Sequence, residues 1–184
     1  MKSRGNGQAK VLNASEISRL FTELNKNPRN ACLFAICFFT GCRVSEALHL
    51  DTSDIKEEII IFRKSITKGK LKTRSIAISP PLRRFLDAYR PRKAGPYFPG
   101  RRGICEFMSR NNADRILKNA CKAVGIEGVS THSFRRSALT HMHRSGIPLR
   151  TIQKISGHGD LGTLQLYLEV SDEEMKIAIN SLNF

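Results

Sequence analysis

Residues 29–46 read RNACLFAICFFTGCRVSE, an apolar run that leads directly into a short polar segment. The run is apolar nearly all round, and this pattern predicts a helix over about 29–39 that is buried on most of its surface. Pro28 suits the first turn of such a helix and Gly41 suits its end. A short helix is expected to begin near Arg43. The stretch therefore predicts a core helix with a polar segment at its end.

The remaining pattern predicts a mainly α fold with a small antiparallel β-sheet, an α+β class. Strands are expected over 59–62 and 75–78, joined into a hairpin by a polar, basic connection. Residues 91–103 are expected to be a loop because they are rich in Pro and Gly. Further helices are expected over 15–26, 80–89, 107–124, 133–144, 149–156, 160–169 and 172–182.

Composition limits the classes of partner. The 184 residues include 31 Lys and Arg against 16 Asp and Glu, a net charge of +15 that attracts polyanions such as nucleic acid. The longest apolar run is too short to span a bilayer, and the first ten residues, MKSRGNGQAK, are not expected to be a signal peptide because they contain no apolar h-region. Five cysteines without a CxxC pair indicate reduced thiols in a cytoplasmic protein, and we expect no metal site and no cofactor.

The positive charge is concentrated in one region. Between Glu58 and Glu106, thirteen Lys and Arg stand against a single acid, Asp87. A solvated basic face is the ordinary interpretation of such a run, but this imbalance favours a surface that follows a DNA backbone. Residues 1–11 are expected to be a flexible basic arm, and residues 12–184 one folded domain.

Four short segments carry candidate chemistry. They are TGCRVSE at 40–46, TKG at 67–69, THSFRR at 131–136, and SGH at 156–158 with Tyr167 nine residues after the histidine. Each alone has an ordinary structural explanation, such as a half-buried core tyrosine or an arginine paired to a nearby glutamate.

Together the segments fit the cleavage of a phosphodiester without a metal. A tyrosine can attack phosphorus if it is helped to lose its proton, and arginines suit the non-bridging oxygens because they stay charged and planar. A lysine can protonate the leaving 5′ oxygen, and histidines can hold the phosphate or move the proton of the nucleophile. The chain offers all of these groups.

In this order the segments resemble the catalytic domain of the tyrosine recombinases, the phage integrase family, over roughly residues 12–175. The resemblance implies that residues 12–184 break and rejoin DNA and that Tyr167 forms a 3′-phosphotyrosyl link. It implies that Lys68 is the general acid and that His132 accepts or positions the proton of Tyr167. Grip on the scissile phosphate would come from Arg43, Arg135 and His158.

Two features depart from the family pattern. Arg136 stands where many relatives carry His, and residue 12 lies where the catalytic domain would begin, so we expect no separate N-terminal DNA-binding domain. The fimbrial phase-variation recombinases share this short layout. Two alternatives are a type IB topoisomerase-like activity, and a DNA-binding or regulatory protein that retains the site.

The sequence also leads to expectations about the partner of the chain, its self-association and the side chains that contact DNA. The partner is expected to be double-stranded DNA near the nucleoid. Residues 171–184 could mediate self-association, or could pack within their own chain. Side chains expected to contact DNA are Lys70, Lys72, Arg74, Arg110, Asn112 and Arg115, and Lys70 and Lys72 also compete with Lys68 as general acid.

Overall fold

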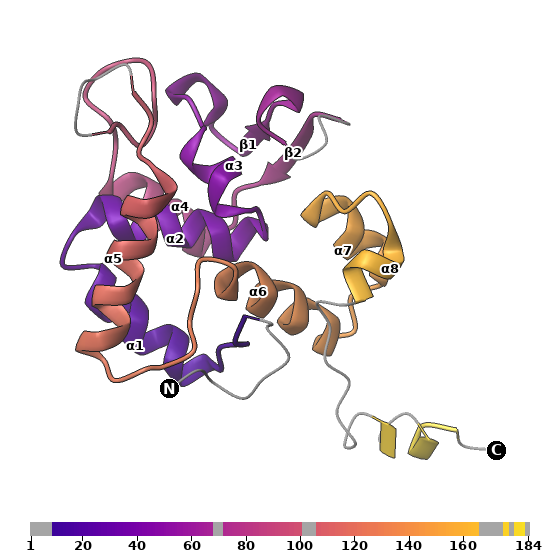
Figure 1. The fold of residues 1–184 in the computed structure, drawn as a ribbon. Coiled ribbons are helices and arrows are strands. Elements are labelled where there is room, and N and C mark those ends of the chain that lie inside the picture. The colour runs from indigo at the N-terminus through magenta and orange to yellow at the C-terminus, as the bar shows by residue number, and fades with distance from the viewer. Residues whose placement is uncertain (1–8, 68–71, 101–105, 166–174, 177–178, 183–184) are drawn as a thin grey trace.

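The computed structural model describes residues 9–67, 72–100, 106–165, 175–176 and 179–182. At its centre is α2 (Pro28–Thr40), which packs against α1 (Ala14–Leu24), α3 (Val44–Leu48), α4 (Pro80–Ala88) and α6 (Ser133–Arg144) (Figure 1). Residues 31–37 of α2 are all buried, so the prediction of a buried central helix is confirmed. Gly41 ends the helix in the left-handed region, at φ 61°.

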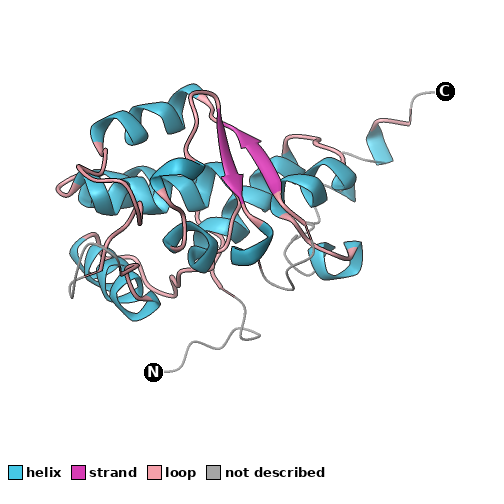
Figure 2. Cartoon of the chain, turned by 90° about the horizontal axis from the view of Figure 1, so that it is seen from above, coloured by secondary structure: helices cyan, strands magenta, loops and turns pink. Residues whose placement is uncertain are grey.

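The small sheet is a hairpin of β1 (Ile59–Phe62) and β2 (Arg74–Ala77), paired antiparallel. Figure 2 shows the two strands among helices and loops. The second strand starts one residue earlier than predicted, and this brings Arg74 into the sheet directly opposite Phe62. Two short 3-10 helices, η1 (Thr52–Asp54) and η2 (Lys64–Ile66), were not predicted. The mainly helical fold with one small antiparallel sheet is confirmed.

The C-terminal half adds α5 (Arg110–Ala123), α7 (Leu149–Ser156) and α8 (Leu161–Gln165). Helix α5 begins later than predicted because the Ser109 hydroxyl caps it by accepting from the Asn112 backbone N–H. Leu139, Ile152 and Leu164 form a small second core that joins α6, α7 and α8. In Figure 1, α6 therefore lies between the main core and the α7–α8 pair.

The segment before α1 is bound to α6. Arg136 donates to the Ala9 carbonyl at 2.5 Å, and the Leu12 N–H donates to the Ser137 hydroxyl at 2.7 Å. The ring of His141 lies 3.0 Å from the Leu12 carbonyl. Residues 9–11, expected to belong to a flexible arm, are thus attached to the domain in the structure.

No helix in the described ranges is long and apolar enough to cross a membrane.

Candidate active site

Arg135 lies at the junction of the two cores. Its side chain is completely buried, and its Nη1 donates to the Gly41 carbonyl at 2.7 Å and to the Ser156 carbonyl at 2.9 Å. Gly41 caps the C-terminus of α2, and Ser156 is the last residue of α7. Helix C-termini carry partial negative charge. Two helix ends therefore stabilise the guanidinium at this junction.

His158 completes this half of the site. It follows Gly157, which ends α7 at φ 70°, and its ring is nearly buried. Nη2 of Arg135 lies 2.9 Å from Nε2 of His158, and the Ser156 hydroxyl lies 2.7 Å from Nδ1. Burial, together with the nearby charges of Arg135 and Arg43, lowers the pKa of His158 to about 3. The imidazole is therefore neutral at physiological pH.

The other half of the site is organised by Glu46, a fully buried carboxylate. Arg43 precedes α3, and its backbone N–H donates to Glu46 Oε2 at 2.8 Å while its Nη1 lies 3.3 Å from Oε1. Arg74 reaches the same carboxylate from β2, with Nη2 2.8 Å from Oε2 and Nη1 3.3 Å from Oε1. Burial would raise the pKa of Glu46, but the hydrogen bond and charge of Arg74 hold that pKa below its usual value.

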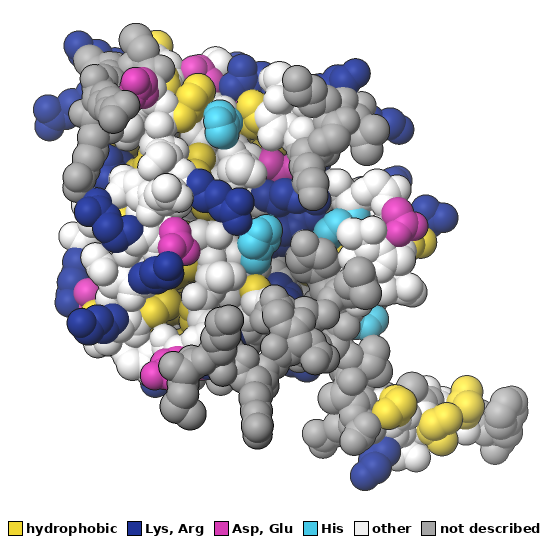
Figure 3. Space-filling view, viewed as in Figure 1, with side chains coloured by type: hydrophobic (Ala, Val, Ile, Leu, Met, Phe, Trp, Pro, Cys, Tyr) yellow, Lys and Arg dark blue, Asp and Glu magenta, His cyan; other side chains and the backbone are white. Residues whose placement is uncertain are grey.

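His132 lies at the N-terminus of α6 and is half-buried. Its Nε2 is 3.5 Å from Nη2 of Arg110, the first residue of α5. Figure 3 shows histidine side chains beside a cluster of Lys and Arg side chains near the middle of this face. The structure thus brings Arg43, Arg135 and His158 together around one junction and places His132 directly before the helix that carries Arg135.

A cavity of about 620 Å³ opens between the hairpin and the end of α7. Lys72 is exposed on its wall. The predicted residues Lys68, Lys70 and Tyr167 lie outside the described residues. The described residues that line it are Thr67, Lys72, Thr73, Arg74, Ser75, Gln153, Lys154, Gly157, His158 and Gly159.

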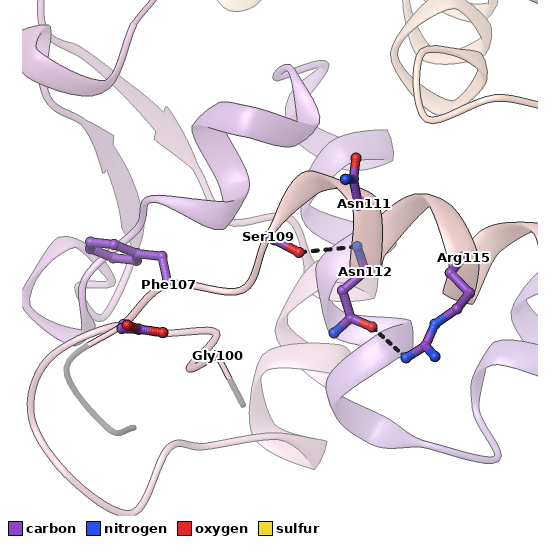
Figure 4. Close-up of a pocket in the computed structure, with 7 residues that line it drawn as sticks. Gly100, Phe107, Ser109, Asn111, Asn112 and Arg115 are labelled. Carbon is purple, nitrogen blue, oxygen red and sulfur yellow. Dashed lines mark hydrogen bonds between the residues drawn. The ribbon is translucent and has the colours of Figure 1, made fainter. Parts of the chain in front are cut away.

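A second cavity, of about 510 Å³, lies at the start of α5 (Figure 4). Asn112 and Arg115 are two of the predicted DNA-contacting residues. Arg115 donates to the Asn112 Oδ1 at 3.0 Å, so their side chains lie side by side. Phe107, which is 36% exposed, lies across this cavity and contacts the ring of His49. The cavity therefore offers amide, guanidinium and aromatic groups that suit an edge or face of a nucleobase.

Sequence reasoning missed the arrangement around Arg74. The residue was expected on a DNA-contacting surface, whereas its side chain is 11% exposed and bound to Glu46. Strand alternation was the signal that could have found it, because Arg74 shares the face of Ile76 that turns inward in β2. Within the described ranges, no group of three or more His, Cys, Asp or Glu side chains could hold a metal ion.

Comparison with known proteins agrees with these motifs. Residues 10–174 match the phage integrase family, which confirms the resemblance seen in the sequence. The tyrosine recombinase XerA of Pyrococcus furiosus is 34% identical over 179 residues, which cover 95% of this chain and 62% of the relative. The chain thus spans less than two thirds of that relative.

Two solved structures have the same fold. The catalytic domain of bacteriophage HP1 integrase has a TM-score of 0.68 at 24% identity, covering 95% of this chain and 97% of that one. The XerH recombinase bound to its difH substrate has a TM-score of 0.73 at 22% identity, covering 92% of this chain and 53% of that one.

Proposed function

This chain belongs to the phage integrase family, and we propose that it is a site-specific DNA recombinase that acts through a 3′-phosphotyrosyl intermediate. The observation that carries the proposal is the junction of Arg135, His158 and Arg43. It holds two guanidinium groups and a neutral imidazole around one point, with one carboxylate nearby. A phosphodiester would supply the missing negative charge.

In the proposed reaction, the oxygen of Tyr167 attacks phosphorus while the bond from phosphorus to the 5′ oxygen breaks. Arg43 and Arg135 donate to the non-bridging oxygens, where charge develops in the transition state, and His158 lies beside them and accepts from Arg135. The proton of the tyrosine passes to His132, and Lys68 protonates the leaving 5′ oxygen. The phosphotyrosyl bond conserves the energy of the cut, so rejoining by a 5′ hydroxyl requires neither ATP nor a metal.

We propose double-stranded DNA as the substrate, in the cytoplasm and at the nucleoid. The net charge of +15 favours polyanions, and the similar XerH structure is a complex with its DNA substrate. Residues 12–184 would be the catalytic domain. Lys70, Lys72, Arg110, Asn112 and Arg115 are the proposed contacts beside the scissile phosphate, and Arg74 is treated separately below.

We also propose self-association on DNA through residues 171–184. Three apolar side chains in the described part of this segment, Met175, Ile179 and Leu182, are each more than half exposed. An apolar stripe of this kind is stabilised when a second surface covers it.

The test is covalent capture. The protein is incubated with nicked duplexes that carry candidate sites, so that cleavage releases a short strand and traps the covalent complex. We expect a protein–DNA adduct that disappears in Tyr167→Phe. If no duplex gives an adduct with folded protein, the proposed function is wrong. Relaxation of a supercoiled plasmid without recombinant products would instead indicate a topoisomerase.

A further inference from the structure

We propose that Arg74 is a positioning residue for DNA cleavage, which acts by holding Glu46 and thereby Arg43, and that it is not itself a contact to DNA. The inference rests on the proposed function, because the reaction it would serve is the phosphodiester cleavage described above. It differs from the expectation drawn from sequence, which placed Arg74 among the DNA-binding side chains.

The first argument is the coordination of Glu46. Each carboxylate oxygen accepts one hydrogen bond from Arg43 and one from Arg74. Because Glu46 is fully buried, water cannot replace a donor that is lost. Removing Arg74 would therefore leave each oxygen with a single donor, and the carboxylate would be free to rotate about Arg43. Glu46 would then no longer hold the backbone and the guanidinium of Arg43 in one position.

The second argument is that Arg74 touches three separate parts of the site. Its guanidinium carbon lies 4.5 Å from the ring centre of Phe62, its partner across the hairpin. A Cβ built on Gly157 would lie only 2.9 Å from its Nη1, so the side chain packs against the backbone immediately before His158. One side chain thus links the hairpin, α3 and the turn that carries His158.

The third argument is the difference between Arg74 and Lys72, its neighbour along the chain. Both line the cavity beside His158. Lys72 is exposed, whereas both Nη atoms of Arg74 bind Glu46 and its side chain is 11% exposed. A phosphate that binds Lys72 would release its condensed counterions into solvent, whereas the charge of Arg74 is already partly neutralised by the carboxylate that it shares with Arg43. Only Lys72 is therefore expected to contribute to the salt dependence of binding.

The experiment uses Arg74→Lys and Arg74→Gln in the full chain. For each variant, the equilibrium constant for DNA binding is measured against salt, and the single-turnover rate of adduct formation is measured at saturating protein. We expect an unchanged salt slope and a cleavage rate at least about 10-fold lower, because the planar two-point contact with Glu46 is lost. Arg74→Lys should retain more activity than Arg74→Gln, because it keeps the charge.

Two control variants show what the loss of a DNA contact and the loss of an arginine outside the site do in the same assays. Lys72→Ala should weaken binding and reduce the salt slope by about one. Arg19→Lys, at an arginine that donates to the Val124 carbonyl outside the site, should leave the cleavage rate unchanged. Urea titration of every variant shows how much protein is folded under assay conditions, and a rate that falls only in proportion to the unfolded fraction would overturn the positioning role.

The substrate with a sulfur in place of the 5′ bridging oxygen separates the remaining alternatives. A sulfur leaving group needs no general acid, so it rescues variants that fail to protonate the leaving group. We expect no rescue of Arg74→Lys, because Arg74 acts through Arg43 on the phosphate. Rescue, or a salt slope reduced by about one with a normal saturated rate, would overturn the inference. Absence of an adduct with the wild-type chain would instead contradict the proposed function.

Discussion

The two halves of the site hold their positive charges in different ways. On the α6 side, Arg135 is completely buried and is stabilised by two carbonyls at helix C-termini and by a neutral histidine. On the α3 side, Arg43 and Arg74 share one carboxylate, Glu46. Dipoles stabilise a charge without neutralising it. The α6 side therefore stays electropositive and is ready for an anion, whereas the α3 side is partly neutralised and is built for fixed geometry.

The largest expected effect is on stability, from Glu46→Gln. The amide has the size of the fully buried carboxylate but leaves the partly buried charges of Arg43 and Arg74 without this counterion, and breaking a buried pair costs about 3–5 kcal/mol. Urea unfolding measures the loss. Glu23→Gln is the matched control, because Glu23 pairs with Lys26 at the surface and its loss should cost less than about 1 kcal/mol. Equal losses of stability in the two variants would mean that the charge of Glu46 does not stabilise the α3 side.

The α6 side should respond most strongly in catalysis. Arg135→Lys keeps a positive charge but cannot reach both carbonyls and His158 with one planar group. We expect the rate of adduct formation to fall about 100- to 1000-fold, as when one donor to a developing oxyanion is removed. Arg136→Lys, one residue along α6, should leave the rate near that of the wild type. A comparable loss in both variants would indicate damage to the helix rather than to the site.

The sequence predicted the α-helices and the hairpin of the described core, but not the two short 3-10 helices. Its apolar run predicted α2, its two short apolar segments predicted the hairpin, and the family resemblance of its motifs implied that Arg43, Arg135 and His158 act at one place. Local periodicity carries this kind of information because each signal lies within about ten residues. The roles of Lys68 and Tyr167 remain predictions.

The sequence did not predict the contacts between distant segments that lie outside these motifs. Arg74 binds Glu46, 28 residues away, and the strand that carries Arg74 starts one residue earlier than predicted. Ala9 is bound through its backbone carbonyl, a group that every residue has, so no sequence signal marks it. These contacts depend on packing, which periodicity alone does not define.

The pH dependence of stability should reflect the α6 side. The pKa of His158 is about 3 in the folded protein against an ordinary value of 6.5, so the unfolded chain binds a proton that the folded chain does not. The contribution of the neutral His158 ring to the free energy of unfolding is fully present above pH 6.5. It is lost as the pH falls toward 3. Between pH 6.5 and 5 the loss is roughly 2 kcal/mol. Urea midpoints across this range measure it, and an identical pH slope in His158→Gln would contradict the assignment.

The smallest expected effect tests the contact between the two sides. Gly157→Ala must adopt φ 70° and must also place a Cβ 2.9 Å from Nη1 of Arg74, whereas Gly125→Ala adopts φ 64° with no atom within 4 Å. The backbone strain is the same in both, about 1–2 kcal/mol. We expect Gly157→Ala to lose more stability than Gly125→Ala and to slow adduct formation, which Gly125→Ala should not do. The additional loss of stability in Gly157→Ala would come from displacement of the Arg74 guanidinium by the new methyl group. This additional loss should therefore be smaller in an Arg74→Lys background, because the lysine head group leaves room for the methyl. An excess that persists there would mean that Gly157 is required for the turn alone and that Arg74 does not link the hairpin to His158.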